Sequence, residues 1–451
     1  MILKWSRFCL ESVRSSRKGI LQIMKRIELF NGVHLSIIPS EKFKTNFMSV
    51  NFVVPLERTT AHTTALVPKV LSRGSRKYPD MALISEKLEY LYDSSVYPIY
   101  SKRAESVICG FGADFIKDRY VPDGKGLLED VADILFDILF DPLTVEGAFR
   151  SDYTESEKAD LINTINAKIN NKASYAKEKC TEIMFKSRPY GLSELGNVSD
   201  VKRATPHDVY MRYQEIVRTA PIEIFFSGEC DEEALAETVR KYVPHSDLRK
   251  TEFPKDGILS GTPEEINEFD EEMPVAQGKL VMGFRIGGIN VNSDDAAAFT
   301  VFNEIFGGSP QSKLFMNVRE AMSLCYYCRS IPDMYISAMF VTSGIESCNK
   351  QKAYDAILLQ LESVKNGEFT DEDLADAKRS IRNAYKELDD SAFAICRWYL
   401  SRIIAGNDYT PYDIIEAIEK VSAEDVVNAA QKVALDTVYF INGTAKAEED
   451  E

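Results

Sequence analysis

Residues 205–228 contain Thr205-Pro-His-Asp-Val-Tyr-Met-Arg-Tyr-Gln214 and then Ile222-Glu-Ile-Phe-Phe-Ser-Gly228. The same pattern returns near the end of the chain as Ser422-Ala-Glu-Asp-Val-Val-Asn-Ala-Ala-Gln431 and then Thr437-Val-Tyr-Phe-Ile-Asn-Gly443. A hydroxyl residue followed three positions later by Asp predicts a helix start, because the hydroxyl caps free N–H groups and the acid complements the positive helix end. The apolar run ending in glycine predicts a strand. The repeated order of cap, helix and strand indicates two homologous halves.

A second pair of matching segments lies earlier in each half. Residues 66–75 correspond to 300–309, and residues 86–91 correspond to 317–322. The duplicated unit contains both helices and strands, so we expect an α+β fold of two tandem halves.

Periodicity predicts the elements of each half. In the first half we expect strands near 26–39, 46–55 and 95–112, with helices near 63–72, 81–91, 126–140, 144–171 and 173–186. In the second half we expect strands near 277–286, 323–331 and 335–344, with helices near 293–306, 311–321, 347–366 and 371–404.

Composition shifts predict the boundaries. Residues 1–24 are basic and lack the apolar core of a secretory signal, so they are either an organellar leader or the product of a start codon placed too far upstream, which we prefer. Residues 245–263 are rich in Pro, Gly and charge and predict a linker. The resulting order is a leader (1–24), a first half (25–244), the linker (245–263), a second half (264–445) and an acidic tail (446–451).

Charge and composition limit the possible functions. The chain has 451 residues, is 45% hydrophobic and carries a formal charge of −16, which argues against nucleic-acid binding. It lacks the ~18-residue apolar run of a membrane span. Its eight cysteines are scattered, which favours a reducing compartment and a cytoplasmic protein. Cys325 and Cys328 form a C-x-x-C on a predicted strand, where positions three apart point to opposite faces, so we expect no redox or metal pair.

Motifs for metal, phosphate or nucleophilic chemistry are missing. The four histidines are His34, His62, His207 and His245, and none has a His or Cys three or four positions away that would share one helix face. The sequence also contains no P-loop, dinucleotide-binding or nucleophile-elbow motif. We therefore expect no cofactor and no catalytic centre in this chain alone.

The second half carries a recognisable signature. Gly307-Gly308-Ser309, Leu314-Phe315-Met-Asn-Val-Arg319 and Glu320-Ala-Met-Ser-Leu-Cys-Tyr-Tyr resemble the second half of the insulinase/pitrilysin metallopeptidases and mitochondrial processing peptidases. The resemblance covers residues 25–445. It implies that each half is a mainly antiparallel sheet with helices on one face. Among bacterial members, the chain most resembles peptidase-like proteins associated with 5-aminopentanol modification of elongation factor P.

The resemblance also implies that the zinc site is degenerate. Catalytic members carry His-x-x-Glu-His on the first-half helix that ends in a turn matched here by residues 73–75. Counting back places Ala65 and Lys69 at the two histidines and Pro68 at the general base, while the later glutamate ligand falls at Thr164. The acidic residue seven positions before that ligand is retained as Glu157. These residues offer neither zinc ligands nor a base, so we expect no bound metal and no hydrolysis by this chain alone.

Arg319 and Tyr326 remain at positions that, in the family, hold the peptide and its tetrahedral intermediate. The resemblance therefore implies a non-catalytic subunit that binds peptide and forms a heterodimer with a zinc-bearing homologue, without nucleic-acid or membrane partners. Two alternatives stay open: a peptide-binding or scaffold protein without a proteolytic partner, and an enzyme of unrecognised chemistry. The residues themselves also allow a structural role, with Arg319 paired to a neighbouring Glu and Tyr326 packed in the sheet.

Overall fold

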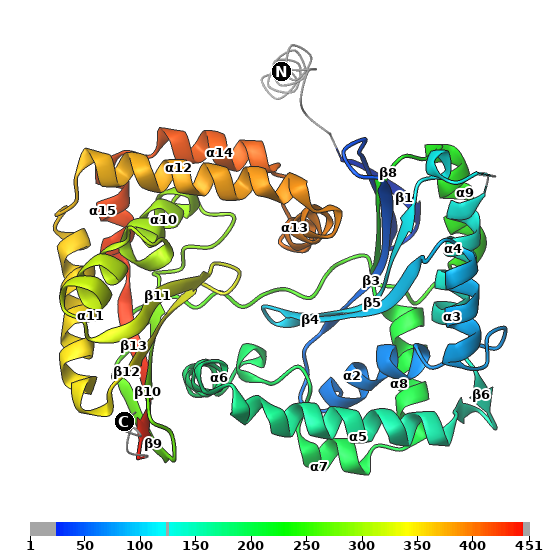
Figure 1. Ribbon diagram of the computed structural model, residues 1–451, viewed down its shortest axis with the longest axis horizontal. Helices are drawn as coiled ribbons and strands as arrows, with labels where there is room; N and C mark the ends of the chain where they lie inside the picture. The colour runs from blue at the N-terminus through cyan, green and yellow to red at the C-terminus, as the bar shows by residue number, and fades with distance from the viewer. Residues whose placement is uncertain (1–23, 123–125, 445–451) are drawn as a thin grey trace.

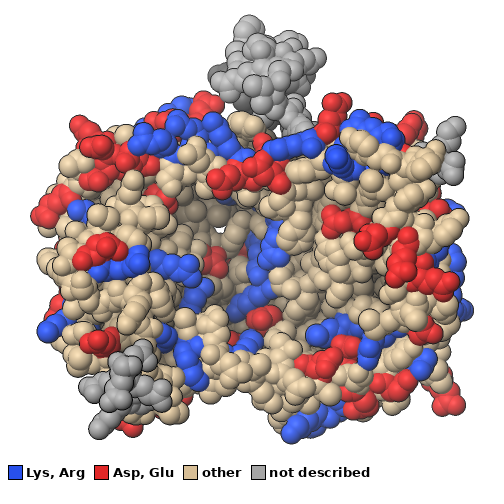
Figure 2. Space-filling model, viewed as in Figure 1, with Lys and Arg blue, Asp and Glu red and all other residues tan. Residues whose placement is uncertain are grey.

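The computed structural model describes residues 24–122 and 126–444, so the predicted leader up to residue 23 and the acidic tail lie outside the described residues. Two halves lie side by side with a hollow between them (Figures 1 and 2). The first half contains β1 (Lys25–Phe30), β2 (Val33–Pro39), β3 (Thr45–Pro55), α2 (Ala61–Leu71), α3 (Met81–Tyr90), β4 (Ser95–Arg103), β5 (Ser106–Ile116), α4 (Leu127–Phe140), β6 (Thr144–Val145), β7 (Ala148–Phe149), α5 (Ser151–Ala167), α6 (Lys172–Met184), α7 (Val198–Arg203), α8 (Pro206–Thr219), β8 (Ile222–Gly228) and α9 (Glu232–Tyr242).

The second half repeats much of this order after a stretch without helix or strand over residues 245–263. Its elements are β9 (Asn267–Met273), β10 (Gly278–Arg285), α10 (Ala296–Asn303), the π-helical segments η4 (Glu304–Gly308) and η5 (Leu314–Ala321), β11 (Cys325–Asp333), β12 (Ala338–Ile345), α11 (Lys350–Lys365), α12 (Asp371–Glu387), α13 (Ala392–Ile404), α14 (Pro411–Lys420), α15 (Ala423–Gln431) and β13 (Ala434–Gly443).

The two sheets have matching topologies. The first has the order β1-β2-β8-β3-β5-β4 and the second the order β9-β13-β10-β12-β11. Among the described strands of these sheets, β2 pairs with β8 and β9 pairs with β13 in parallel, and the other neighbours are antiparallel. The expectation of two homologous, mainly antiparallel α+β halves is therefore confirmed.

Strand alternation divides each sheet into an outer and an inner face. Along β3, Met48, Val50 and Phe52 join the core beneath the helices of the same half, whereas Phe47 and Val53 point to the opposite face. This alternation follows from the period of two in a strand. The outer faces therefore carry one helix-covered core per half.

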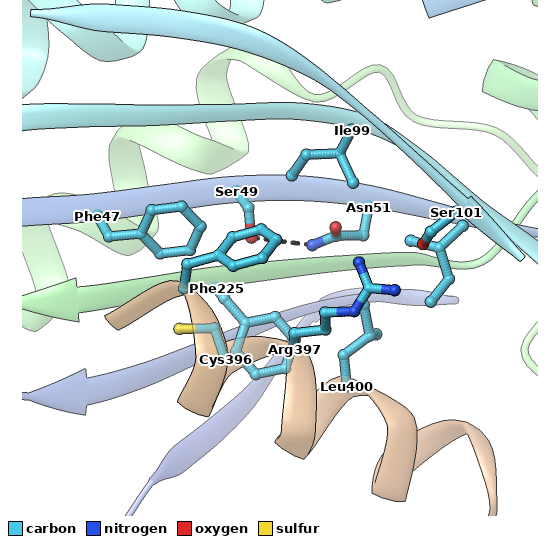
Figure 3. A pocket seen from close by; sticks show the side chains of 11 residues that line it. Phe47, Ser49, Asn51, Ile99, Ser101, Phe225, Cys396, Arg397 and Leu400 are labelled. Atoms are coloured by element: carbon cyan, nitrogen blue, oxygen red, sulfur yellow. Dashed lines mark hydrogen bonds between the residues drawn. The ribbon is translucent and has the colours of Figure 1, made fainter. Parts of the chain in front are cut away.

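The inner faces are covered by an exchange of helices. In the first half, a 17-residue helix (α5), a 3-residue turn (Lys168–Asn170) and a 13-residue helix (α6) follow one another. The second half repeats these lengths in α12, Leu388–Asp390 and α13. α6 lies against β10 and β13 of the second sheet, and α13 lies against β3 and β8 of the first. Figure 3 shows Cys396, Arg397 and Leu400 of α13 facing the first sheet.

Two long helices predicted from the sequence are interrupted. The expected helix at 144–171 begins only at Ser151, because Glu146 and Gly147 both have positive φ and form a tight two-residue turn between β6 and β7. The expected helix at 371–404 breaks after Glu387, and the Ser391 hydroxyl accepts a hydrogen bond from the Ala394 N–H to start α13.

Two further expectations can be compared with the structure. The strands expected at 26–39 form a hairpin of β1 and β2, whose turn at Asn31-Gly32 has Gly32 at φ +71°. The second-half helices expected near 293–306 and 311–321 change to π-helical geometry over η4 and η5. In a π-helix, backbone hydrogen bonds join residues five positions apart. Such segments are rare overall, and those that occur are often found at functional sites.

None of the described helices combines the length and the apolar character needed to cross a membrane.

The helix exchange predicts that α13 contributes to the stability of the whole chain. Leu400 is buried between α13 and the first sheet, so Leu400→Ala should lower the free energy of unfolding by about 2–5 kcal/mol. Denaturant unfolding followed by far-UV circular dichroism measures this change. Leu359→Ala is the matched control, because Leu359 is 58% exposed on α11 and its truncation should have little effect. Equal effects of the two variants would contradict the packing role of α13.

Candidate functional site

The first-half positions that match the zinc motif form a cluster of ion pairs. Lys69 and Arg73 lie one turn apart near the C-terminal end of α2, and Glu157 faces them from α5. The Lys69 Nζ lies 3.9 Å from Glu157 Oε2, and the Arg73 Nε lies 3.0 Å from Glu157 Oε1. Arg73 also donates a hydrogen bond of 2.6 Å to the Ser156 hydroxyl. Two cations therefore occupy the space beside the carboxylate.

The electrostatics of this cluster do not fit a zinc ion. Burial raises the pKa of the Glu157 carboxyl, and the charges of Arg73 and Lys69 partly oppose that rise. Ala65 and Pro68 carry no side-chain donor atom, and an ammonium group repels a metal ion. Within residues 24–122 and 126–444, no three His, Cys, Asp or Glu side chains are grouped closely enough to hold a metal.

The structure brings some of the predicted zinc-site positions together and leaves one apart. Ala65, Pro68 and Lys69 share α2, and Glu157 is the acid that meets them. Thr164 is exposed two turns further along α5, and its hydroxyl donates to the Asp160 carbonyl at 2.9 Å. From the sequence, Arg73 was assigned only to the turn after the motif helix, and its ion pair with Glu157 was not predicted. Its spacing of four residues from Lys69 was the signal that both face the same acid.

Arg319 lies on the π-helical segment η5. Its guanidinium is 3.5 Å from the Glu320 carboxylate and lies over the Phe315 ring at 4.4 Å from the centroid. The side chain keeps 37% of its surface exposed. Arg319 therefore does pair with a neighbouring Glu, as expected if its role is structural, but its guanidinium remains accessible to solvent.

Tyr326 does not pack into the sheet as the structural alternative expected, because it is 73% exposed. On β12, Ile345 pairs with Cys325 and the next residue, Gly344, pairs with Tyr327, so Tyr326 is an extra residue in a β-bulge. Ser323 just before it has φ +52°. The π-helix, the positive φ and the bulge together place three backbone irregularities between residues 314 and 327. Such features concentrate at functional sites.

The bulge also overturns the expectation for the C-x-x-C. Cys325 and Cys328 pair with Ile345 and Ser343, which are two residues apart on β12 and therefore share a face. Both cysteines join the outer core of the second half rather than opposite faces. The inserted residue changes an i, i+3 relation into an effective i, i+2 relation.

A cavity lined by residues of both halves lies between them. Its volume is about 350 Å³, and its lining includes Lys102 and Arg103 of β4, Asp333 of β11 and Arg397 of α13. Figure 2 shows both basic and acidic side chains around the hollow between the halves. Burial lowers the pKa of Lys102 to about 8 and raises the pKa of Asp333. Asp256 pairs with Arg103 at 2.5 Å, so the positive charges of this lining are partly compensated.

Comparison with known proteins identifies the family. The family model "Peptidase M16 inactive domain" matches residues 203–381. The chain is 33% identical to the "Probable inactive metalloprotease YmfF" of Bacillus subtilis over 92% of this chain and 97% of that protein. It is 21% identical to the "Mitochondrial-processing peptidase subunit beta" of Saccharomyces cerevisiae over 69% of this chain and 70% of that protein.

A solved structure supports the same assignment. A conserved protein from Enterococcus faecalis V583 superimposes with a TM-score of 0.87 and 26% identity, covering 94% of this chain and all of that one. The degenerate first-half site and the duplicated fold agree with these similarities. The chain belongs to the M16 (insulinase/pitrilysin) peptidase family, as one of its inactive metalloprotease-like members of bacterial type.

Proposed function

We propose that the chain is a non-catalytic subunit of a heteromeric M16 peptidase. It binds peptide between its halves and supplies Arg319 and Tyr326 to the reaction site of a zinc-bearing homologue. The observation that carries this proposal is the contrast between the two halves. The first-half site is closed by Lys69, Arg73 and Glu157, whereas the second half presents Arg319 and Tyr326 on irregular backbone.

The chemistry of the two side chains suits this role. A guanidinium and a phenol are hydrogen-bond donors that stabilise the oxyanion formed when a peptide carbonyl is attacked. The Arg319–Glu320 pair is exposed, and exposed ion pairs contribute about 0–1 kcal/mol. A substrate or partner oxygen can therefore replace Glu320 at little cost.

Peptide binding is supported by the edges of the two sheets. β4 ends the first sheet and β11 ends the second, and residues of both strands line the cavity between the halves. Edge strands offer unpaired N–H and C=O groups to an extended peptide.

The similarity to a subunit of mitochondrial processing peptidase supports the two-chain arrangement. We further propose that this assembly acts in the cytoplasm. From the resemblance of the whole sequence, we propose that it takes part in the modification of elongation factor P. The alternative is a peptide-binding scaffold without a proteolytic partner. Both functions are compatible with this fold. Only the peptidase subunit requires Arg319 and Tyr326 for the turnover of a peptide.

The closed first-half site predicts that the purified chain holds no stoichiometric zinc after dialysis. Elemental analysis measures the metal content. The variant Ala65→His, Pro68→Glu, Lys69→His should gain zinc, because its two imidazoles share one helix face next to Glu157. Stoichiometric zinc in the wild-type chain that disappears in Glu157→Gln would contradict this interpretation.

Mixing the chain with its zinc-bearing homologue should produce peptidase activity that neither protein has alone. Tyr326→Phe or Arg319→Ala should then lower kcat by about 10²–10³, because each removes an oxyanion donor. Steady-state kinetics on a fluorogenic peptide gives kcat, and size-exclusion co-elution shows whether the two chains still associate.

The matched control for this experiment is Tyr90→Phe, because Tyr90 is 79% exposed in the first half and should leave kcat unchanged. Unchanged turnover for both site variants, with normal co-elution, would favour the scaffold alternative.

A further inference from the structure

The second sheet lacks a counterpart of one strand of the first. In the first sheet, β1 covers the outer edge of β2, which runs parallel to β8. In the second sheet, β9 takes the place of β2, because it runs parallel to β13, and no described strand lies beyond it (Figure 1). Residues 243–266, which precede β9, form neither helix nor strand. Within the described residues, this edge of the second sheet therefore has no partner strand.

β9 is both accessible and regular. Residues 267–270 and Glu272 are exposed, and Glu271 is half-buried. The register of β9 on β13 runs over seven residue pairs without a shift. Proteins often protect an edge strand with a proline or a β-bulge, and β9 has neither. Its outward N–H and C=O groups can therefore pair with an added strand.

The side chains of β9 form two rows. Glu268, Asp270 and Glu272 lie on the outer side, because the β13 residues beside the first two belong to the helix-covered core of the second half. Asp270 pairs with Lys350 at 2.6 Å, whereas no ion pair of Glu268 or Glu272 is found within the described structure. Phe269 lies on the other side and is 46% exposed. A strand added at this edge would meet carboxylates on one face and an aromatic ring on the other.

The first half shows what kind of strand covers the equivalent edge. β1 begins with two basic residues, Lys25 and Arg26. The Arg26 Nε donates a hydrogen bond of 3.1 Å to Glu223 Oε2, and the Lys25 ammonium pairs with Glu232 of α9. Acidic groups of neighbouring elements thus hold a basic edge strand in place. The edge of β9 carries the acidic groups without such a strand.

We propose that the free edge of β9 binds, by strand addition, an extended segment of a partner protein in which basic residues alternate with apolar ones. The basic side chains lie beside Glu268, Asp270 and Glu272, and the apolar ones lie beside Phe269. A second copy of β9 does not fit, because like charges directly opposite one another are destabilising. The edge is separate from those of β4 and β11, so the proposal does not depend on the peptidase function.

The test measures binding of a fluorescent Lys-Val-Lys-Val-Lys-Val-Lys peptide to the full-length chain by fluorescence anisotropy. Low ionic strength is used, because salt screens exposed charge pairs. The Lys-Val peptide should bind, and the same peptide with Glu in place of Lys should not. Absence of binding by the Lys-Val peptide, or equal binding of both peptides, would overturn the proposal.

A charge exchange tests the role of the acidic row. Glu268→Lys with Glu272→Lys should weaken binding of the Lys-Val peptide by about tenfold or more and should permit binding of the Glu-Val peptide, because opposed charges become like charges and the reverse. The matched control is Glu86→Lys with Glu89→Lys, which changes two exposed acids on α3. Equal loss in both double variants would show that the peptide responds only to the net charge of the chain.

Two measurements distinguish strand addition from attraction between charges alone. The peptide should slow hydrogen–deuterium exchange of the amides of residues 267–273, which mass spectrometry detects. Successive residues of a strand direct their N–H groups to opposite edges. N-methylation of one alternate set of peptide residues should therefore abolish binding, and N-methylation of the other set should leave it. Unchanged exchange in β9, or equal effects of the two N-methylated sets, would contradict strand addition.

Two further outcomes would assign the edge to a different occupant. Residues 1–23 are basic, so tighter peptide binding after their removal would indicate that this segment of the chain itself competes for β9. Slow exchange at residues 267–273 in the chain without peptide, together with a dimer in sedimentation experiments, would indicate a second copy. We expect neither result, and either one would overturn the assignment to a partner protein.

Discussion

The exchange of α6 and α13 between the halves is the constraint on which the rest of the structure depends. The helices of each half cover only the outer face of its own sheet. The inner faces carry large apolar side chains, such as Phe225 in the first sheet and Phe340 in the second, which the exchanged helices bury. Large exposed apolar patches are unfavourable in water, so neither sheet is fully covered without the opposite half. The two halves thus cover each other's inner faces and pack together.

The exchange also explains why the degenerate zinc site is a stable piece of structure. α5 carries Glu157, and the chain continues into α6, which is fixed on the second sheet. The carboxylate is therefore held in a buried position, where an unpaired charge would be strongly unfavourable. Lys69 and Arg73 supply the positive charge that a metal ion would otherwise provide. Glu157 is thus balanced by two side-chain cations of the same half.

Sequence patterns predicted the duplicated architecture well because the repeated signals are local. The Thr205–Asp208 and Ser422–Asp425 caps form the expected reciprocal hydrogen bonds at the starts of α8 and α15. The break before α13 was missed because apolar periodicity continues across it. The first half contains the same break at Asn171, so comparison of the halves would have revealed it. At the site, counting along the sequence placed Thr164 at the later ligand position and Glu157 seven residues before it, but it did not indicate that Glu157 pairs with Lys69 and Arg73, because that contact depends on the packing of α5 on α2.

The bulge at Tyr326 is the feature that no local window of sequence could predict. Leu-Cys-Tyr-Tyr-Cys has the composition of a regular strand, and alternation alone places Cys325 and Cys328 on opposite faces. The register is set by pairing with Ser343 and Ile345, which lie in another strand. One inserted residue reverses both expectations, because it exposes the Tyr326 phenol and brings the two thiols onto one face. The exposure of the Tyr326 phenol and the shared face of the two cysteines therefore have one structural origin, the residue inserted at the bulge.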